Sequence, residues 1–505
     1  MSSDPKKGWC IPLQEYKIFV KKIGLVGVSS ILASLSPLVL LPILSQDLTA
    51  SQYGAWNQFI VTMTIIPAIA SLGLPYTMVR YLAAAEDQEE IREVFYSLGF
   101  AALFGSLAVS ILILLLGRPI ANLLFEGNYL ISAILSMVIF LNGLILLFFD
   151  YFRTFQEMKT YSIFTFAQAY LMVILVAIFI SMSYGIVGAV IAVLITQIIT
   201  FVVMYLPILS RIGFKIPEFN NLREYLNFGL PTIPSNISFW VLDIADRYVI
   251  GLLLGLSFVG YYSAGYLLGN IISLILSPFY TVLLPILSKY YAQNRVHDVK
   301  RLLNHSIKFF LMVSIPTFFG LTVLAKPILN ILSTPEIASN GYIVVPIIAL
   351  GGIFFGVYGI ISQIVVLEHK TRITGNIWII SAVLNLVLDV TLGFRFGIIG
   401  VAFTTLLVYI FSFLLTVFYS FRYIRCTFYF GFLTKSIGAS ILMAIALILL
   451  NPQRPLNIVL ASFVAVIMYI VILRLIGGIR DHELVFFKSV AIDVLESIVK
   501  PFKKL

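Results

Sequence analysis

Long blocks of apolar residues, separated by short polar segments, make up most of the chain. Each block is ~20 residues long, the length that an α-helix needs to cross ~30 Å of hydrocarbon. The blocks lack the strict alternation of apolar and polar residues that is typical of an outer-membrane β-barrel. The pattern therefore predicts an all-α integral membrane protein with about fourteen transmembrane helices. The predicted spans are 23–45, 55–79, 95–116, 130–150, 161–181, 185–208, 226–254, 258–286, 307–331, 341–366, 374–393, 397–420, 431–450 and 456–477.

The composition agrees with this pattern and excludes other classes of protein. Of the 505 residues, 60% are hydrophobic and 11% are charged, too few charges to cover a soluble protein of this length. The net charge of +10 could suit nucleic acid, but the basic residues lie singly and in small groups between apolar blocks, so we expect no nucleic-acid partner. Cys10 and Cys426 are far apart and predict no disulfide.

The basic residues indicate how the spans are oriented, because Lys and Arg concentrate in cytoplasmic loops. With the N-terminus in the cytoplasm, all but five of the 33 Lys and Arg residues fall on the cytoplasmic side. The five others are Arg118, Arg247, Lys326, Arg395 and Arg454. An odd number of spans would destroy this asymmetry, so we expect a multi-pass protein of the cell membrane with both termini in the cytoplasm.

An internal repeat relates the two halves of the chain. Short motifs of the first half recur about 206 to 212 residues later, and they keep their order. The segment Arg118-Pro-Ile corresponds to Lys326-Pro-Ile, and Tyr184-Gly-Ile corresponds to Phe396-Gly-Ile. Spans one to six thus correspond to spans seven to twelve. Because six is even, the repeat is parallel, with its pseudo-two-fold axis along the membrane normal.

The repeat predicts the division of the chain into regions. A cytoplasmic or interfacial N-terminus (1–22) precedes an N-lobe with spans one to six (23–210) and a C-lobe with spans seven to twelve (211–425). Two appended spans (431–477) and a cytoplasmic, interfacial amphipathic tail (478–505) follow. Two six-helix lobes related in this way are typical of transporters, whose lobes rock to expose a central cleft alternately to each side.

Several motifs carry a family resemblance. They are Leu48-Thr-Ala-Ser-Gln-Tyr53-Gly54, Gly73-Leu-Pro-Tyr-Thr-Met-Val-Arg80-Tyr81, Asp246-Arg247-Tyr-Val-Ile-Gly251, Val259-Gly260-Tyr261-Tyr262, Pro285-Ile-Leu-Ser-Lys289 and Gly397-Ile-Ile-Gly400. In this order and spacing, residues 15–475 resemble the polysaccharide biosynthesis exporters, of the O-antigen flippase type, in the multidrug/oligosaccharidyl-lipid/polysaccharide superfamily. The resemblance implies a secondary transporter, not an enzyme, that flips a polyprenyl-(pyro)phosphate-linked oligosaccharide from the inner to the outer leaflet.

The seventh span carries the main candidate site. Five of its side chains fall within about one-third of the helix circumference. They are Asn236, Trp240, Asp243, Asp246 and Arg247. Charged groups near mid-membrane are costly unless they face a cavity or each other, so we expect these residues to line the substrate cavity, with Asp243 or Asp246 free to bind a coupling ion. The alternative is that Asp243 and Arg247, four residues apart, pair and lock helix packing.

Three further residues complete the predicted cavity. Asn385 and Asp389 share one face of the eleventh span with Ser381, although they could instead form a polar helix contact or a solvated outer end. Arg80, at the cytoplasmic end of the second span, suits a phosphate because its guanidinium fork matches the oxyanions. The alternative for Arg80 is an interface anchor.

Prolines recur at corresponding places in the two halves and predict matched interruptions of the helices, a feature of transport sites. They are Pro37, Pro42, Pro67 and Pro75 in the first half, and Pro231, Pro234, Pro278 and Pro285 in the second. The alternative is that membrane helices simply tolerate proline.

The expected partners are a lipid-linked oligosaccharide and membrane lipids, and we expect a monomer. Contacts with other glycan-assembly proteins stay open, and no cofactor is expected beyond coupling to Na⁺ or H⁺. A rival function is a multidrug/cation antiporter, which typically has twelve spans, or another lipid flippase of the superfamily. A membrane-embedded glycosyltransferase or polymerase would need a large catalytic loop, whereas no predicted outer loop exceeds about 15 residues. We therefore expect no catalytic residues and no metal site.

Overall fold

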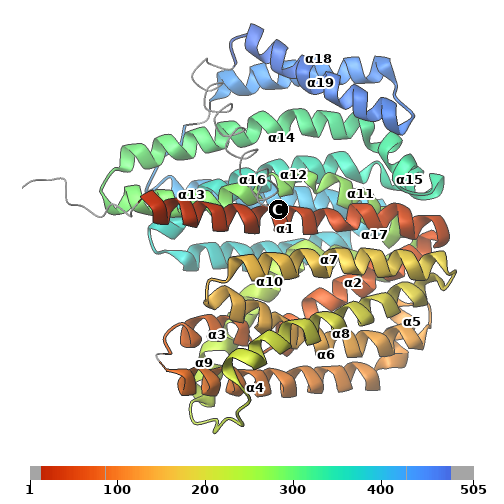
Figure 1. Ribbon diagram of the computed structural model, residues 1–505. Helices are drawn as coiled ribbons and strands as arrows, with labels where there is room; N and C mark the ends of the chain where they lie inside the picture. The colour runs from red at the N-terminus through yellow and green to blue at the C-terminus, as the bar shows by residue number, and fades with distance from the viewer. Residues whose placement is uncertain (1–12, 86, 428, 479–505) are drawn as a thin grey trace, which may run out of the picture.

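The structure is a computed structural model that describes residues 13–85, 87–427 and 429–478, and the regular elements of that part are all helices (Figure 1). The first half contains α1 (Leu13–Asp47), α2 (Ala50–Ala70), α3 (Leu74–Leu82), α4 (Gln88–Leu115), α5 (Gly117–Leu124), α6 (Tyr129–Thr154), α7 (Met158–Ser181) and α8 (Gly185–Ile212). The second half contains α9 (Leu222–Gly229), a 3₁₀ turn η1 (Leu230–Thr232), α10 (Ile233–Leu253), α11 (Leu256–Gly269), α12 (Ile271–Leu274), α13 (Ser277–Ala292), α14 (Val296–Leu332), α15 (Pro335–Gly341), α16 (Val344–Leu367) and α17 (Thr371–Ser420). The helices α18 (Phe430–Leu450) and α19 (Pro455–Leu475) follow.

Each predicted span coincides with a helix or with a set of shorter helices. Ten helices in the described residues are long and apolar enough to cross a membrane. Spans two, seven and eight are broken into shorter helices, and spans eleven and twelve are the two arms of α17. The all-helical membrane fold is therefore confirmed, while the count of fourteen spans stays a prediction.

The arms of α17 meet at Gly397, whose φ of 61° lies in the left-handed region that glycine enters without steric cost. The first arm (371–393) and the second arm (397–420) run side by side, because the hydroxyls of Ser381 and Ser412 lie 2.8 Å apart. The repeat-related turn between α7 and α8 contains Gly185, with a φ of 57°. The same turn chemistry thus recurs in both halves.

The predicted interruptions are matched in spans two and eight but not in spans one and seven. The second span breaks between α2 and α3, and the eighth breaks between α11 and α13. The seventh span breaks at η1, which contains Pro231. Its counterpart α1, however, continues through Pro37 and Pro42 without a break. For this pair of spans, proline alone does not determine where a helix stops.

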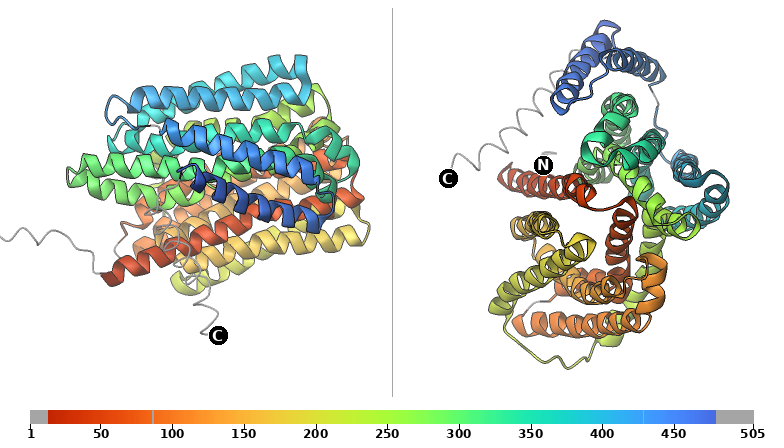
Figure 2. Two further views of the ribbon diagram at one scale, coloured as in Figure 1. Left: turned by 90° about the horizontal axis from the view of Figure 1, so that it is seen from above. Right: turned by 90° about the vertical axis from the view of Figure 1, so that its right-hand side faces the viewer.

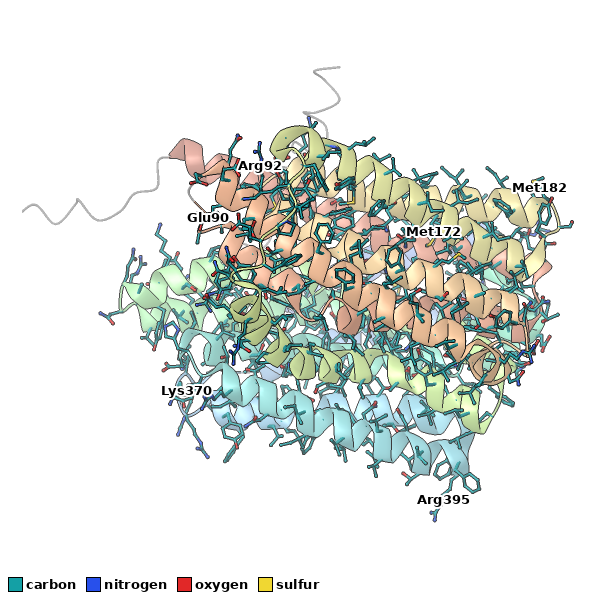
Figure 3. All side chains as sticks on the ribbon, turned by 90° about the horizontal axis from the view of Figure 1, so that it is seen from below. Glu90, Arg92, Met172, Met182, Lys370 and Arg395 are labelled. Atoms are coloured by element: carbon teal, nitrogen blue, oxygen red, sulfur yellow. The ribbon has the colours of Figure 1, made fainter. Side chains whose placement is uncertain are left out.

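The helices share one direction, so the molecule has two ends. Figure 3 shows Glu90, Arg92 and Lys370 at one end and Met182 and Arg395 at the opposite end. We call these the inner and the outer end, after the predicted topology. The labelled residues that we predicted on the two sides of the membrane therefore lie at opposite ends of the helices.

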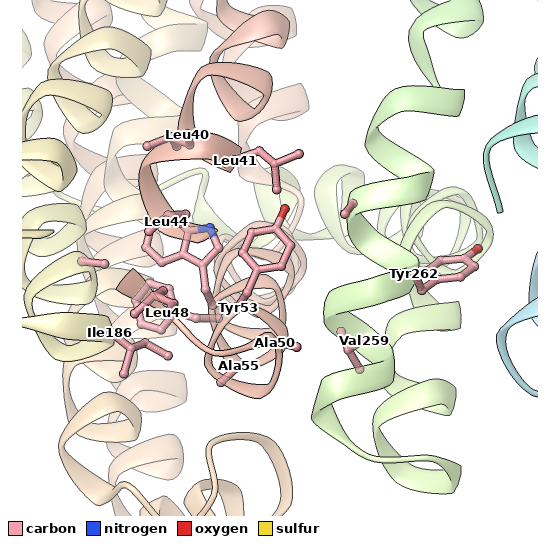
Figure 4. Packing of buried hydrophobic residues seen from close by; sticks show 14 of the residues in the cluster. Leu40, Leu41, Leu44, Leu48, Ala50, Tyr53, Ala55, Ile186, Val259 and Tyr262 are labelled. Atoms are coloured by element: carbon pink, nitrogen blue, oxygen red, sulfur yellow. The ribbon is translucent and has the colours of Figure 1, made fainter. Parts of the chain in front are cut away.

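The hydrophobic cores show that the lobes share one cluster at the outer end, whereas each lobe has a cluster of its own towards the inner end, where α1 and α13 lie in contact. The largest cluster includes Leu41 of α1, Tyr53 of α2 and Val259 of α11, so it spans both lobes (Figure 4). Towards the inner end, the N-lobe and the C-lobe have a cluster each. The C-lobe cluster includes residues of α18 and α19, which pack against α14 on the outside of the bundle (Figure 2, right).

The helices α2 and α11 cross at two glycines that the repeat relates. A Cβ atom on Gly54 would lie 1.9 Å from the carbonyl oxygen of Leu256, and one on Gly260 would lie 2.3 Å from the carbonyl oxygen of Ala50. Ala50 and Leu256 are separated by the same interval as Gly54 and Gly260. The crossing is therefore symmetric about the pseudo-two-fold axis, and it brings two backbones into direct contact, as small residues permit between membrane helices.

The segment between α8 and α10 is fastened to the N-lobe. The Glu93 carboxylate of α4 accepts hydrogen bonds from the backbone N–H groups of Glu218 (2.9 Å) and Phe219 (3.1 Å). The Thr77 hydroxyl of α3 donates to the carbonyl of Tyr225 in α9 at 3.3 Å. The polypeptide thus leaves the N-lobe at η1, some twenty residues later than the predicted start of the C-lobe at residue 211.

Some predicted segments lie outside the described residues. They are residues 1–12 of the N-terminus, with Cys10, and residues 479–505 of the amphipathic tail. Cys426, between α17 and α18, is a buried free thiol, and burial raises the pKa of this thiol to about 11.

Candidate functional site

A buried ion pair lies within α10. Asp246 and Arg247 expose only 3% and 9% of their surface. The Arg247 guanidinium lies 2.8 Å from the Asp246 carboxylate and donates to the backbone carbonyl of Asp243 at 2.6 Å. The ion-pair partner of Arg247 is thus its sequence neighbour, so the alternative of an Asp243–Arg247 side-chain pair is wrong. Helix spacing favoured a partner four residues away, but the Arg247 side chain folds back along its own backbone instead.

Two tyrosines of α11 complete this network. The Tyr262 hydroxyl donates to Asp246, and the Tyr266 hydroxyl donates to Asp243 at 3.0 Å. The Arg247 guanidinium lies 4.0 Å from the centre of the Tyr266 ring, a cation–π contact. Sequence reasoning missed both tyrosines, although their spacing of four residues and the family motif that contains Tyr262 were available signals.

The first arm of α17 adds a third carboxylate. Asp389 is completely buried and lies within electrostatic range of Asp246, and Asn385 lies one turn away at 1% exposure. In the described part of the chain, the amide oxygen of Asn385 accepts no hydrogen bond, and the Thr404 hydroxyl is the hydrogen-bonding neighbour of the Asp389 carboxylate. The Thr404 hydroxyl lies within hydrogen-bonding range of Asp389 and 3.2 Å from the carbonyl of Gly400, and its single proton can satisfy only one of the two. Buried oxygens with too few partners are costly, which indicates that they bind something else.

The net charge of the cluster determines which kind of ligand it can bind. Asp243, Asp246 and Asp389 provide three carboxyl groups, whereas Arg247 is the single basic residue among them. Because a buried excess of carboxylates repels anions and attracts cations or protons, the cluster is suited to a cation and unsuited to a phosphate.

The remaining predicted residues lie apart from this cluster or can be placed only in part. Arg80 is exposed on α3, at the inner end, and its guanidinium lies 4.4 Å from the centre of the Phe228 ring of α9. Trp240 is half-buried on α10. The side chain of Asn236 lies outside the side chains that the structure describes. The structure therefore brings together Asp243, Asp246, Arg247, Asn385 and Asp389.

The N-lobe contacts the cluster through α2. The Gln58 amide donates to the backbone carbonyl of Arg247 at 2.7 Å, and the Thr62 hydroxyl lies 2.7 Å from that of Tyr248. A Cβ on Gly251 would lie 2.7 Å from the Gln58 amide nitrogen, so glycine leaves the room that this side chain needs. The cluster therefore lies at the contact between the lobes, next to a pair of hydrogen bonds that joins them.

Comparisons with known proteins agree with this fold. The chain is 26% identical over 279 residues to a protein of Haloferax volcanii named "Probable low-salt glycan biosynthesis flippase Agl15", covering 54% of this chain and 59% of the relative. It is 30% identical over 139 residues to "Probable lipid II flippase MurJ" of Rickettsia prowazekii, covering 26% of this chain and 27% of the relative. The matches thus span less than two-thirds of either relative.

A solved structure extends the likeness to nearly the whole chain. The structure titled "Lipid II flippase MurJ, inward closed conformation" has a TM-score of 0.74 and 18% sequence identity, and the match covers 92% of this chain and 99% of that one. At this identity the likeness shows a shared fold.

Family profiles match the chain as well. The MatE profile matches residues 231–391. The profile described as "Polysaccharide biosynthesis protein" matches residues 19–291, which is more than half of the chain. The chain therefore belongs to the polysaccharide biosynthesis protein family, within the multidrug/oligosaccharidyl-lipid/polysaccharide superfamily.

Proposed function

We propose that this protein is a transporter, not an enzyme, and that it flips a lipid-linked oligosaccharide across the cell membrane by alternating access. The observation that carries the proposal is the buried charge cluster at the contact between two repeat-related lobes. A transporter needs a contact of this kind, because ligand binding there can favour one arrangement of the lobes over the other. The names of the two relatives support a lipid-linked glycan as the substrate.

In this proposal, the coupling cation and the phosphate of the substrate bind at two different places in the protein. Asp389 and Asn385, which lie beside Asp246, bind the coupling cation, Na⁺ or H⁺, because the cluster has an excess of negative charge and their buried oxygens have too few partners in the described residues. The phosphate of the substrate is bound at the inner end, where Arg80 is exposed. The sequence already predicted ion coupling for Asp243 or Asp246. This assignment keeps Asp246 near the cation and moves Asn385 and Asp389 from the substrate cavity to ion coupling. Trp240 stays a proposed residue of the substrate cavity.

The first experiment measures delivery of the lipid-linked glycan to the outer leaflet in cells that lack the protein and other flippases. We expect delivery to stop, and to resume when the protein is supplied again. Unchanged delivery would overturn the proposal. Accumulation of one glycan in the inner leaflet would also identify the substrate.

A second experiment tests the phosphate contact. Arg80→Gln removes the charge without changing the length of the side chain much, so we expect a higher KM for the glycan in flipping assays and an unchanged thermal stability. Arg223→Gln is the matched control, because Arg223 is also exposed, on the neighbouring α9. If both variants behave like the parent, Arg80 is an interface anchor.

A multidrug/cation antiporter is the second candidate function. The MatE profile match over residues 231–391 favours it, because this match includes α10 and part of α17 with their acidic residues. Drug efflux from cells that express the protein, measured with and without a Na⁺ or pH gradient, distinguishes the two functions. Efflux without glycan delivery would replace the first proposal by the second.

A further inference from the structure

A line of buried polar side chains runs along the two arms of α17, which meet at Ser381 and Ser412. On the first arm, Ser381, Asn385 and Asp389 are four residues apart, so they share one face. On the second arm, Ser412, Thr416 and Ser420 have the same spacing. All six are at most 3% exposed. We call these six residues the polar seam.

The seam joins the cation cluster to the inner end of the molecule. The hydroxyls of Ser381 and Ser412 lie 2.8 Å apart, which fixes the register of the antiparallel arms. Asp389 lies two turns from this contact on one side, and Ser420, the last residue of α17, lies two turns away on the other. At 1.5 Å per residue the seam is about 24 Å long, most of the ~30 Å of a hydrocarbon core.

The hydrogen bonds of the seam are incomplete. Ser381 and Ser412 satisfy each other, but the hydroxyls of Thr416 and Ser420 have no partner in the described residues. The oxygen of Asn385 also has none, and the Asp389 carboxylate has only the single proton of Thr404 within reach there. A hydroxyl in a membrane helix can bond to the carbonyl four residues earlier, as Thr405 does to Val401. The two inner hydroxyls of the seam do not use this option.

The neighbouring helix α16 adds another unpaired oxygen at the inner end. Gly351 of α16 packs against Tyr409 of the second arm, at 3.3 Å from a Cβ built on the glycine. Counting twelve residues along both helices from this contact places Gln363 level with the end of α17. Its amide oxygen is buried and also lacks a partner within the described residues. The oxygens with too few partners thus continue from Asp389 to the inner end.

From these observations we infer that the polar seam is a hydrated passage, through which the coupling cation moves between Asp389 and the inner end. Buried water would satisfy the unpaired oxygens, because internal waters bind where several polar groups converge. Hydroxyls both donate and accept, so they can pass a proton or replace part of the hydration of Na⁺. The alternative is dry helix packing, in which polar side chains bond to one another. The inference rests on the cation coupling proposed above.

Hydroxyl-radical footprinting of the purified protein tests for water directly, because buried water is activated in place. Tyr409 lies on the face of the seam, three residues before Ser412, and is 9% exposed. Tyr469 is the matched control: it is 4% exposed, and its hydroxyl is satisfied by Ser436 and by the carbonyl of Met312. We expect Tyr409 to be oxidised several times faster than Tyr469. Equal rates would overturn the passage.

Flipping assays test whether the cation uses the passage. Thr416→Val keeps the shape of the side chain and removes the hydroxyl, so we expect gradient-driven flipping to slow several-fold. Thr317→Val is the control, because Thr317 is half-buried outside the seam and its hydroxyl is bonded to the carbonyl of Val313. A Na⁺ gradient at equal pH and a pH gradient at equal Na⁺ distinguish the two cations. If Thr416→Val flips at the rate of the parent, the passage is wrong.

The two measurements separate this inference from the proposed function. Footprinting requires no transport, so a parent protein that does not flip glycan overturns the proposed function and leaves the water result standing. If the parent protein flips glycan but its Tyr409 is oxidised no faster than Tyr469, only the hydrated passage is overturned and the proposed function stands.

Discussion

The two lobes share one backbone plan but differ in the polarity of equivalent positions. In the C-lobe, the contact between spans eleven and twelve contains Asp389 and other buried oxygens with too few partners in the described residues. In the N-lobe, the corresponding contact between α7 and α8 is neutral: the Gln168 amide donates to Gln197 at 3.0 Å, and Gln197 lies 3.8 Å from the sulfur of Met63. The repeat interval of about 212 residues makes Gln197 the counterpart of Tyr409.

This difference indicates which features belong to the fold and which to the function. Since the N-lobe folds into the same arrangement without charges at these positions, the fold does not require them. A charged side chain in the centre of a bilayer costs a few kcal/mol, so it is retained for a task other than folding. The symmetric features, such as the crossing of Gly54 with Gly260, serve the arrangement of the lobes, and the asymmetric ones are those that we propose for cation binding.

The largest expected effect follows from Asp389→Asn, which removes the charge and keeps the shape. We expect flipping to lose its dependence on a cation gradient. In the presence of a gradient, the flipping rate should be at least about tenfold lower than that of the parent, which corresponds to a barrier ~1.4 kcal/mol higher. Thermal stability should stay equal or rise, because a buried carboxylate with too few partners is removed. Proteoliposome assays with and without a gradient measure the effect, and Gln197→Leu in the N-lobe is the control that should keep the dependence. Coupling that survives Asp389→Asn would place the cation elsewhere.

A symmetric effect, on stability and not on cation dependence, is expected at the outer end. Leucine at Gly54 or at Gly260 would force two helix backbones apart, and overpacking of this kind costs about 1 to 3 kcal/mol. Because the crossing is symmetric, Gly54→Leu and Gly260→Leu should lower the melting temperature by similar amounts and shift the lobes towards separation at this end. Spectroscopic distances between labels on the outer ends of α2 and α11 measure the shift. An effect of one substitution without the other would show that the lobes do not share the contact equally.

Much of the fold could be predicted because the bilayer imposes simple rules on the sequence. Span length, positive charges and repeated motifs are local in the chain, so they indicated helices and lobes before any contact was known. The end of a helix was harder to predict. Pro231 lies at a break and Pro37 does not, because neighbouring helices decide whether the freed carbonyl finds another partner.

The site was predicted in part, for a similar reason. Helix spacing correctly grouped Asp243, Asp246 and Arg247 on α10, but it could not show that Arg247 pairs with Asp246. The contributions of Tyr262 and Asp389 depend on which face of α11 and α17 packs against α10. These contacts arise from tertiary packing, which a pattern within one helix does not contain.

The hydrogen bond between the lobes at the cluster should contribute about 1 kcal/mol to holding the lobes together, which is the usual net contribution of a hydrogen bond. Gln58→Leu removes the bond to the carbonyl of Arg247 and also removes an amide oxygen that lacks a partner in the described chain, which offsets part of the loss. We expect faster separation of the lobes and a weaker dependence on the cation gradient. Gly251→Ala disturbs the same bond from the other lobe, because its Cβ would crowd the Gln58 amide. Opposite changes in the two variants would contradict a shared contact.

The smallest effect is expected at the contact between α7 and α8 of the N-lobe, where neutral amides lie instead of a carboxylate. Gln168→Leu removes one neutral hydrogen bond within the lobe, and such bonds between membrane helices contribute about 0.6 kcal/mol on average. We therefore expect a small decrease in thermal stability and no change in the Na⁺ or pH dependence of flipping.

Ser381→Ala is the C-lobe counterpart: it also removes a bond between adjacent spans, but one that lies in the polar seam. A change in cation dependence for Ser381→Ala and none for Gln168→Leu, at similar losses of stability, would confine the passage of the cation to one lobe. Equal behaviour of the two variants would mean that polarity differs between the lobes without a difference in function.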